Sequence, residues 1–366
     1  MQKKILVLVP DYPNKNSHAL MYVHVRNKYY VKHGITPVVL NFNAKANYTY
    51  DGIKVITYEA YTKNSGKFDL LVCHAPNVKN HYRFLKKFEN RFKKIIFIFH
   101  GHEILKINDV YPPEYPWTGI KRRPLVRNFY DNMKFFLWRK EIKKLLPKSH
   151  LIFVSNWLYQ RFLYYVRLNP NELDGKVSII NNSVAEVFEK KTYNQKGIKK
   201  YDFLTIRGDS IDGSKYGIDL VCKLAENNPK NSFLIIGRGN FFKYNSIPKN
   251  VKYLNTTLNH DDMLNYINES RCALLPTKQD TQGVVTCEMA TYGVPTITSD
   301  IDISREVFSG VENVGLIDNA KVEKTKLMPI LNKINKKKAS KNEKFFAKNT
   351  TKLEVDLIMR EMRGVC

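Results

Sequence analysis

The sequence predicts an α/β protein with two domains, each built around a doubly wound parallel sheet. Short apolar runs of strand length alternate along the chain with segments of helical periodicity, as in such sheets. Several of the runs are apolar throughout, which is typical of parallel strands that are covered on both faces. The chain has 366 residues, of which 43% are hydrophobic, and this is enough for two α/β domains of ordinary size.

The first half of the chain contains seven strand-like runs, at residues 3–9, 36–40, 54–57, 69–73, 95–99, 151–155 and 177–180. Helical patterns lie between most of them, beginning with residues 18–33. The segment His100-Gly-His-Glu follows the fifth run directly, so His100 is a candidate site residue at a strand end. A structural histidine and a metal ligand are the alternatives. No further cluster of His or Cys accompanies the segment, which makes a metal site the weakest of the three.

Two basic segments also lie in this half. Residues 121–148 contain ten Lys or Arg against two acids, and apolar side chains recur there at helical spacing: Val126, Phe129, Tyr130, Met133 and Leu137. Together with the basic residues 83–94, they predict a surface that docks on an anionic membrane. The alternatives are a helix whose apolar stripe packs on its own domain, and a nucleic-acid surface. No RNA- or DNA-binding motif supports the last.

The second half contains strand-like runs at residues 203–207, 232–237, 251–254, 271–275 and 294–298. The first of these ends in Arg207, and Lys215 stands where the following helix begins. One cation at a strand end and another at the next helix start are well placed to bind an anionic group. The alternative is that both are surface cations in a lysine-rich chain.

The stretch 276–300 predicts a strand end, a polar loop, a short helix that stops at Gly293, and another strand. Asp280 precedes this helix and Glu288 lies inside it, so both carboxylates can face one crevice. A helix start offers unpaired backbone N–H groups and partial positive charge, here at Gln282, Gly283, Val284 and Val285. A carboxylate inside the helix can accept hydrogen bonds from vicinal hydroxyls. The combination suits a sugar nucleotide, and the alternative is an ordinary structural unit with two solvated acids.

Asp280, Gly283, Glu288 and the ending Ala290-Thr-Tyr-Gly-Val-Pro295 resemble the nucleotide-sugar signature of retaining glycosyltransferases of family four, the glycosyl transferases group 1. The resemblance implies the GT-B fold, in which two Rossmann-like domains face each other across a cleft and the last helix crosses back to the first domain. It also implies roles. Arg207 and Lys215 would clamp the donor diphosphate, and Glu288 would hold the ribose hydroxyls. Asp280 with the N–H groups after it would hold the sugar, and His100 would contact the sugar or the acceptor.

On this basis we expect an N-terminal acceptor- and membrane-facing domain over residues 1–190. We expect a nucleotide-sugar-binding domain to follow over residues 191–345. A final helix at residues 346–366 would pack back on the first domain. The donor would be a UDP- or GDP-sugar, without a cofactor or an obligatory metal. The acceptor would be a lipid-linked saccharide or an oligosaccharide, in capsule or exopolysaccharide synthesis. No nucleophile stands out, which agrees with the front-face mechanism of the family.

Composition sets further bounds. The formal net charge of +26 indicates an anionic partner: membrane lipid, a diphosphate ligand or nucleic acid. The five cysteines are scattered, so we expect reduced thiols. No run is long and apolar enough to span a membrane or to act as a signal peptide. We therefore expect a cytoplasmic protein on the inner face of the cell membrane. A sugar-nucleotide epimerase of GT-B fold and a non-enzymatic nucleotide or polyanion binder are the rival functions.

Overall fold

The computed structural model of the chain describes residues 3–15, 17, 19–68, 70–120, 123–208, 211–336 and 341–363. The chain divides into two compact units. The first consists of Met1–Ile107, Leu125–Ser183 and Phe346–Cys366, and the second of Asn108–Pro124 and Val184–Phe345. The domain limits at residues 190 and 345 stay predictions. Some residues of the predicted elements lie outside the described residues: His18, Asp69, Lys121, Arg122 and, in the predicted last helix, residues 364–366.

The first unit is built on an eight-stranded sheet with the order β3-β4-β2-β1-β5-β6-β7-β8. Its neighbouring strands pair in parallel, except that β3 runs antiparallel to β4 at the edge. The strands are β1 (Lys3–Val9), β2 (Ile35–Asn41), β3 (Tyr48–Tyr50), β4 (Ile53–Ile56), β5 (Leu70–His74), β6 (Lys94–Phe99), β7 (Ser149–Phe153) and β8 (Val177–Ile179).

The helices of the first unit are α1 (Met21–Lys32), α2 (Tyr58–Lys63), α3 (Arg83–Phe88), α5 (Pro124–Leu145), α6 (Asn156–Val166) and α14 (Thr351–Arg363). The short α4 (Ile107–Val110) lies where the chain leaves the first unit for the second. Ile5 to Val9 of β1 are fully buried because the sheet carries helices on both faces. Within the described residues, no helix is both long and apolar enough to span a membrane.

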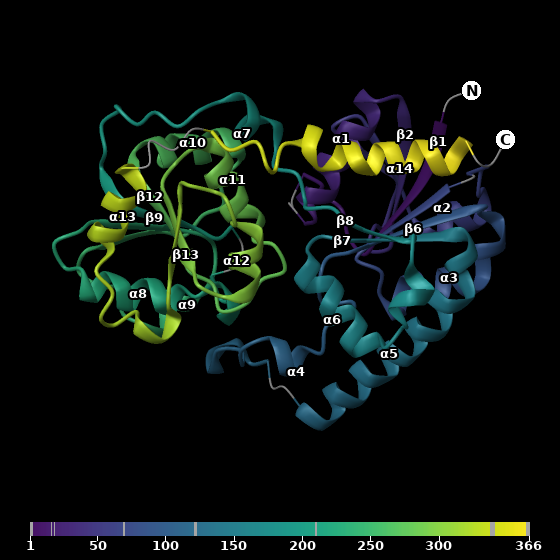
Figure 1. Cartoon of the computed structure of the whole chain (residues 1–366), viewed down its shortest axis with the longest axis horizontal. Helices are drawn as coiled ribbons and strands as arrows, with labels where there is room; N and C mark the ends of the chain where they lie inside the picture. The colour runs from purple at the N-terminus through teal and green to yellow at the C-terminus, as the bar shows by residue number, and fades with distance from the viewer. Residues whose placement is uncertain are drawn as a thin grey trace. The chain divides into compact units, whose positions relative to one another are not determined.

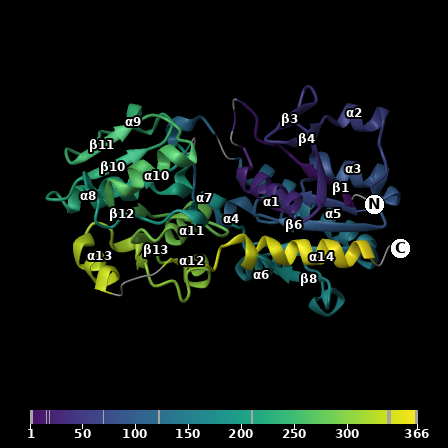
Figure 2. The same cartoon turned by 90° about the horizontal axis from the view of Figure 1, so that it is seen from above.

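The C-terminal helix α14 belongs to the first unit, where it packs beside α1 (Figures 1 and 2). A buried ion pair joins the two helices, because the Nε of Arg26 lies 2.9 Å from one oxygen of Glu354 and 3.1 Å from the other. The hydroxyl of Tyr30 donates to Glu354 at 2.6 Å, and Asn182 accepts from Arg26. The predicted return of the last helix to the first domain is therefore confirmed.

The second unit is built on a six-stranded, all-parallel sheet with the order β11-β10-β9-β12-β13-β14. The strands are β9 (Tyr201–Ile206), β10 (Phe233–Ile236), β11 (Val251–Leu254), β12 (Ser270–Leu275), β13 (Thr296–Ser299) and β14 (Val314–Ile317). The helices are α7 (Glu186–Lys190), α8 (Ile218–Asn227), α9 (Phe241–Tyr244), α10 (His260–Asn268), α11 (Val284–Tyr292), α12 (Asp302–Val307) and α13 (Leu327–Lys336).

Side chains alternate between the two faces of this sheet. Phe203, Phe233 and Ile235 point to a core that they share with α8, α9 and α13. The residues between them point to the other face, where α10 and α11 pack against β12 and β13 (Figure 1). Both units therefore confirm the predicted α/β class with two Rossmann-like domains.

The strand order locates the edge at which a ligand is expected in the second unit. The chain passes from β9 outward to β10 and β11 and then returns to the other side of β9 with β12. Open α/β sheets bind ligands outside the carboxyl ends of the strands at such a switch point. The segments that leave β9 and β12 at this edge begin with Arg207 and Pro276.

Candidate functional site

Arg207 leaves the end of β9 as a buried cation. Its side chain is only 8% exposed, and its Nη2 donates to the carbonyl of Pro276 at 2.7 Å. Burial lowers the pKa of Arg207, while the negative charge of Asp280 opposes this shift. An arginine stays charged under these conditions. Its Nε has no hydrogen-bond partner in the part of the chain that the structure describes, so this buried donor is available to an anion.

Lys215 and Arg207 both contact one aromatic ring, that of Tyr216. The ammonium of Lys215 lies 4.7 Å from the ring centre of Tyr216, and the guanidinium of Arg207 lies 5.5 Å from the same centre. The structure thus places both residues of the predicted clamp against the same ring, and their role as a diphosphate clamp stays a prediction.

The backbone around Lys215 is fixed by the segment that leaves β12. The carbonyl of Lys215 accepts hydrogen bonds from the N–H of Lys278 at 2.7 Å and from the hydroxyl of Thr277 at 2.8 Å. Gly217 closes the turn with φ +64°, and a Cβ there would lie 2.9 Å from the carbonyl of Pro276. Only glycine allows this close approach. The two loops at the switch point therefore form one rigid structure.

Asp280 lies at the start of α11. Its Oδ1 accepts from the N–H of Thr281 at 2.7 Å and of Gln282 at 3.4 Å, so the N–H of Gln282 points to this carboxylate. Gly283 is the N-cap in a left-handed conformation, and the N–H groups of Val284 and Val285 follow at the first turn, where a helix supplies no acceptor. A carboxylate at this position repels phosphate but accepts sugar hydroxyls. The Asp280 end of the site therefore suits the sugar, and the two cations suit the phosphates.

Glu288 lies in the second turn of α11 and is 8% exposed. Burial raises its pKa to about 8, so the unliganded site holds this carboxyl largely protonated at neutral pH. The Nε2 of His260, the first residue of α10, lies 3.9 Å from the carboxyl. A protonated imidazole would favour the carboxylate, yet burial outweighs this neighbour. Desolvation at this level is typical of carboxyls that work in a binding site.

His100 belongs to the first unit and lies at the end of β6. Its Nε2 is 3.1 Å from the Nδ1 of the fully buried His74, and its ring lies 4.6 Å from that of Tyr22. Burial lowers the pKa of both histidines, so both are neutral near pH 7. The backbone N–H of His100 donates to Glu103. In the described part of the chain, no group of three or more His, Cys, Asp or Glu is arranged to hold a metal.

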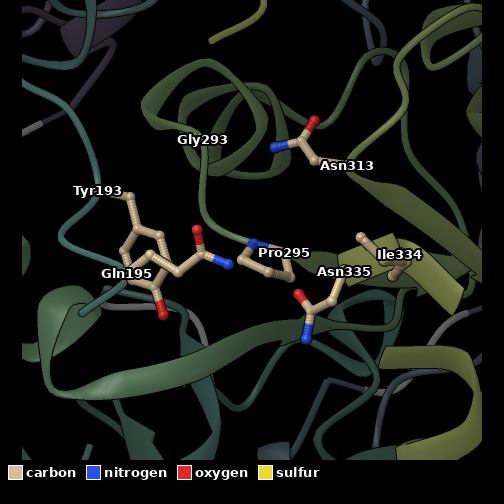
Figure 3. Close-up of a pocket in the computed structure, with 7 residues that line it drawn as sticks. All are labelled: Tyr193, Gln195, Gly293, Pro295, Asn313, Ile334 and Asn335. Atoms are coloured by element: carbon tan, nitrogen blue, oxygen red, sulfur yellow. The ribbon is translucent and has the colours of Figure 1, made fainter. Parts of the chain in front are cut away.

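A pocket of about 480 Å³ lies elsewhere in the second unit (Figure 3). It adjoins Gly293 at the end of α11, and Pro295 and Asn313 just before β13 and β14. It therefore lies at the amino ends of the strands, opposite the edge that carries Arg207. Asn313 donates to the carbonyls of Ala290 and Val294, which is a structural role. We do not assign this pocket to the site of the two cations.

Sequence reasoning missed several residues around the two cations. Tyr216 is adjacent to Lys215 in the chain, and both cations lie over its ring. Asp219 binds Lys278 at 2.6 Å and so joins α8 to the loop after β12. Tyr111 and Tyr115 come from the segment 108–124, which packs in the second unit. The concentration of Tyr, Pro and Trp in residues 111–117 was the available signal.

Comparisons with known proteins address the family of the second unit and the fold of the whole chain. Residues 206–326 match the family described as glycosyl transferases group 1. A search of curated protein sequences finds no match. Sucrose-phosphate synthase from Thermosynechococcus elongatus is similar in structure, with a TM-score of 0.70 and 11% identity over 100% of both chains.

Two further solved structures are similar over nearly the whole chain. WaaG, a glycosyltransferase involved in lipopolysaccharide biosynthesis, has a TM-score of 0.66 and 12% identity, over 97% of this chain and 99% of its own. The pneumococcal O-GlcNAc transferase GtfA, determined with UDP and GlcNAc, has a TM-score of 0.66 and 11% identity over 99% of both chains. At these identities the likeness shows the fold, and the predicted GT-B fold is confirmed.

Proposed function

Because residues 206–326 match the family described as glycosyl transferases group 1, we propose that the protein is a retaining glycosyltransferase. It would move a sugar from a nucleotide diphosphate sugar to a saccharide acceptor, in lipid-linked form, during cell-surface polysaccharide synthesis. The observation that carries this proposal is the pairing of Arg207 and Lys215 on the ring of Tyr216, at the switch point of the sheet.

The two cations would stabilise the leaving group, the nucleoside diphosphate. When the bond between the anomeric carbon and the β-phosphate oxygen breaks, negative charge develops on the diphosphate. Arg207 and Lys215 are fixed before this happens, so they stabilise the transition state more than the bound donor. Because this pair supplies positive charge at the diphosphate, we propose that the reaction has no obligatory metal.

The acidic residues would bind the ribose and the sugar of the donor. Glu288 would accept hydrogen bonds from the two ribose hydroxyls, and Asp280 would hold the sugar together with the N–H groups at the start of α11. The acceptor hydroxyl would form the new bond to the anomeric carbon on the face that the diphosphate leaves. Its proton would pass to the departing phosphate oxygen, so no enzyme nucleophile is needed. From the first unit, His100 would contact the sugar or the acceptor.

The test is incubation of the purified chain with a panel of labelled UDP- and GDP-sugars. We expect release of the nucleoside diphosphate from one donor, and Arg207→Met should reduce this release at least about 100-fold, because it removes a charge aimed at the leaving group. Arg271→Met, an exposed arginine of the same sheet, is the matched control and should leave the release unchanged.

Other outcomes would contradict the proposal. An epimerase would convert the free sugar nucleotide without releasing the diphosphate, and a binding protein would do neither. Equal release by the wild type and Arg207→Met, with both folded by circular dichroism, would remove Arg207 from the site.

A second part of the proposal concerns the exposed face of α5. The face that packs in the first unit carries Phe135, Trp138 and Ile142, which are buried. The opposite face leaves Leu125 85% and Phe129 74% exposed, with Val126 and Phe136 beside them. The ammonium of Lys140 lies over the ring of Phe136 at 5.4 Å. Apolar side chains with interleaved cations suit an anionic bilayer surface, so we propose that this face brings the enzyme to a lipid-linked acceptor.

Removing the apolar groups should weaken membrane binding without harming the donor site. We expect Leu125→Ser, Phe129→Ser and Phe136→Ser in one chain to reduce sedimentation with phosphatidylglycerol vesicles at least about tenfold. The control is Ile198→Ser, which removes an 87% exposed apolar side chain from the second unit. Binding to anionic vesicles that equals the wild type would contradict docking by this face, and so would equal binding to phosphatidylcholine vesicles by the wild type.

A further inference from the structure

Residues 108–124, which we name the strap, leave the first unit after Ile107, within α4, and belong to the second unit. The ring of Trp117 stacks between Tyr115, at 4.6 Å, and Tyr244, at 5.5 Å, and both stacks are nearly parallel. Tyr115 and Trp117 also pack against the core of α8, α9 and α13. The strap is therefore anchored in the second unit by apolar burial.

The strap is bonded on both sides of Lys215. Before it, the hydroxyl of Ser214 donates to Glu114 at 3.4 Å. After it, the hydroxyl of Tyr115 donates to Asp219 at 2.6 Å, and Asp219 also pairs with Lys278 at 2.6 Å. These bonds fix the strap to the same turn that carries the lysine.

The strap also contacts the charged end of Lys215. Its ammonium lies 5.4 Å from the ring centre of the buried Tyr111, and 4.7 Å from that of Tyr216. A lysine has a long, flexible side chain, and two aromatic rings attract its ammonium through their negative faces. A cation held in place before the ligand arrives loses less freedom when the ligand binds.

We propose that Tyr111 is a positioning residue of the site, whose ring holds the Lys215 ammonium where it meets the donor diphosphate. The inference rests on the proposed function, since it takes Lys215 as a ligand of the diphosphate. The strap follows the first unit in the chain, and through Tyr111 it would take part in binding the donor in the second unit. The role is carried by the ring and not by the hydroxyl.

The test compares Tyr111→Leu with Tyr111→Phe, using inorganic pyrophosphate as the probe and calorimetry to measure its affinity. Tyr111→Leu removes the aromatic face and should weaken binding about three- to tenfold, whereas Tyr111→Phe keeps the face and should stay within about twofold. Tyr164→Leu, at an exposed tyrosine of the first unit, is the matched control and should bind as the wild type does.

A double-variant cycle with Lys215→Ala separates positioning from a general loss of structure. If Tyr111 acts through Lys215, adding Tyr111→Leu to Lys215→Ala should change the affinity by less than about twofold. The same loss in both backgrounds, or an equal loss for the Leu and Phe variants, would overturn the inference. Unchanged pyrophosphate binding by Lys215→Ala would instead overturn the diphosphate role of Lys215 in the proposed function.

Discussion

Exchanging Glu288 for glutamine is expected to reduce kcat/KM for the nucleotide-sugar donor by about 10- to 100-fold above pH 8, where the carboxyl is ionised, because a hydrogen bond to a charged group contributes more than one to a neutral group. The amide has the shape of the carboxylate, so the loss reports on charge and not on packing. Steady-state kinetics with the donor found in the screen measure it. Glu312→Gln, at an exposed carboxyl of the same unit, is the control and should have wild-type kinetics.

The pH dependence of this reaction follows from burial. The pKa of Glu288 is about 8, and only the ionised carboxyl accepts from both ribose hydroxyls. We therefore expect kcat/KM to rise with pH up to about 8 and then to level off, since this ratio reports ionisations of the free enzyme. Glu288→Gln should lack this rise. A variant that retains it would show that another group titrates.

The same ionisation acts on stability with the opposite sign. The folded state raises the pKa of Glu288 from 4.5 to about 8, so it favours the protonated carboxyl. This contribution to stability is fully present below pH 4.5 and is lost as pH rises through 8. Glu288→Gln should therefore unfold at a higher urea concentration than the wild type above pH 8, and the two should converge toward pH 4.5. Ionisation of Glu288, which donor binding requires, therefore lowers the stability of the wild type above pH 8.

The largest effect on stability is expected at the other end of the chain. Glu354→Gln should lower the free energy of unfolding of the first unit by about 3–5 kcal/mol, because it leaves Arg26 as an uncompensated charge in the interior. Both side chains of this pair are fully buried. Urea unfolding followed by circular dichroism measures the change.

The matched control lies on the same helix. Asp356→Asn breaks the exposed pair with Lys352, and we expect a change of under about 0.5 kcal/mol. Glu354→Met combined with Arg26→Met should recover part of the loss, since it removes both charges together. If Glu354→Gln were as stable as the control, the pair would not hold α14 in place.

Much of the architecture follows from local patterns. The apolar runs of β1, β6 and β12 have the length and composition of buried parallel strands, and Gly293 ends α11 as expected. Arg207, Lys215 and Asp280 could be proposed as site residues because strand ends and helix starts are local features, and parallel strands bring their carboxyl ends to one edge.

Other features depend on contacts that no local pattern contains. The buried face of α5 includes Asp131 and Lys134, which pair at 2.8 Å inside the first unit, so hydropathy alone does not identify this face. The raised pKa of Glu288 depends on what α10 and α11 pack against. The strap lies in the second unit because Tyr115 and Trp117 find partners far away in the sequence.

The position of α14 has a consequence for the order in which the protein is made. Translation proceeds from the N-terminus, and domains generally fold as they leave the ribosome. The first unit, however, receives Glu354 only in the last residues, after all of the second unit has been synthesised. Until then Arg26 has no carboxylate beside it. The unit that emerges first is thus the last to be completed. A nascent chain that stalls before residue 351 contains all of the second unit, whereas its first unit still lacks α14.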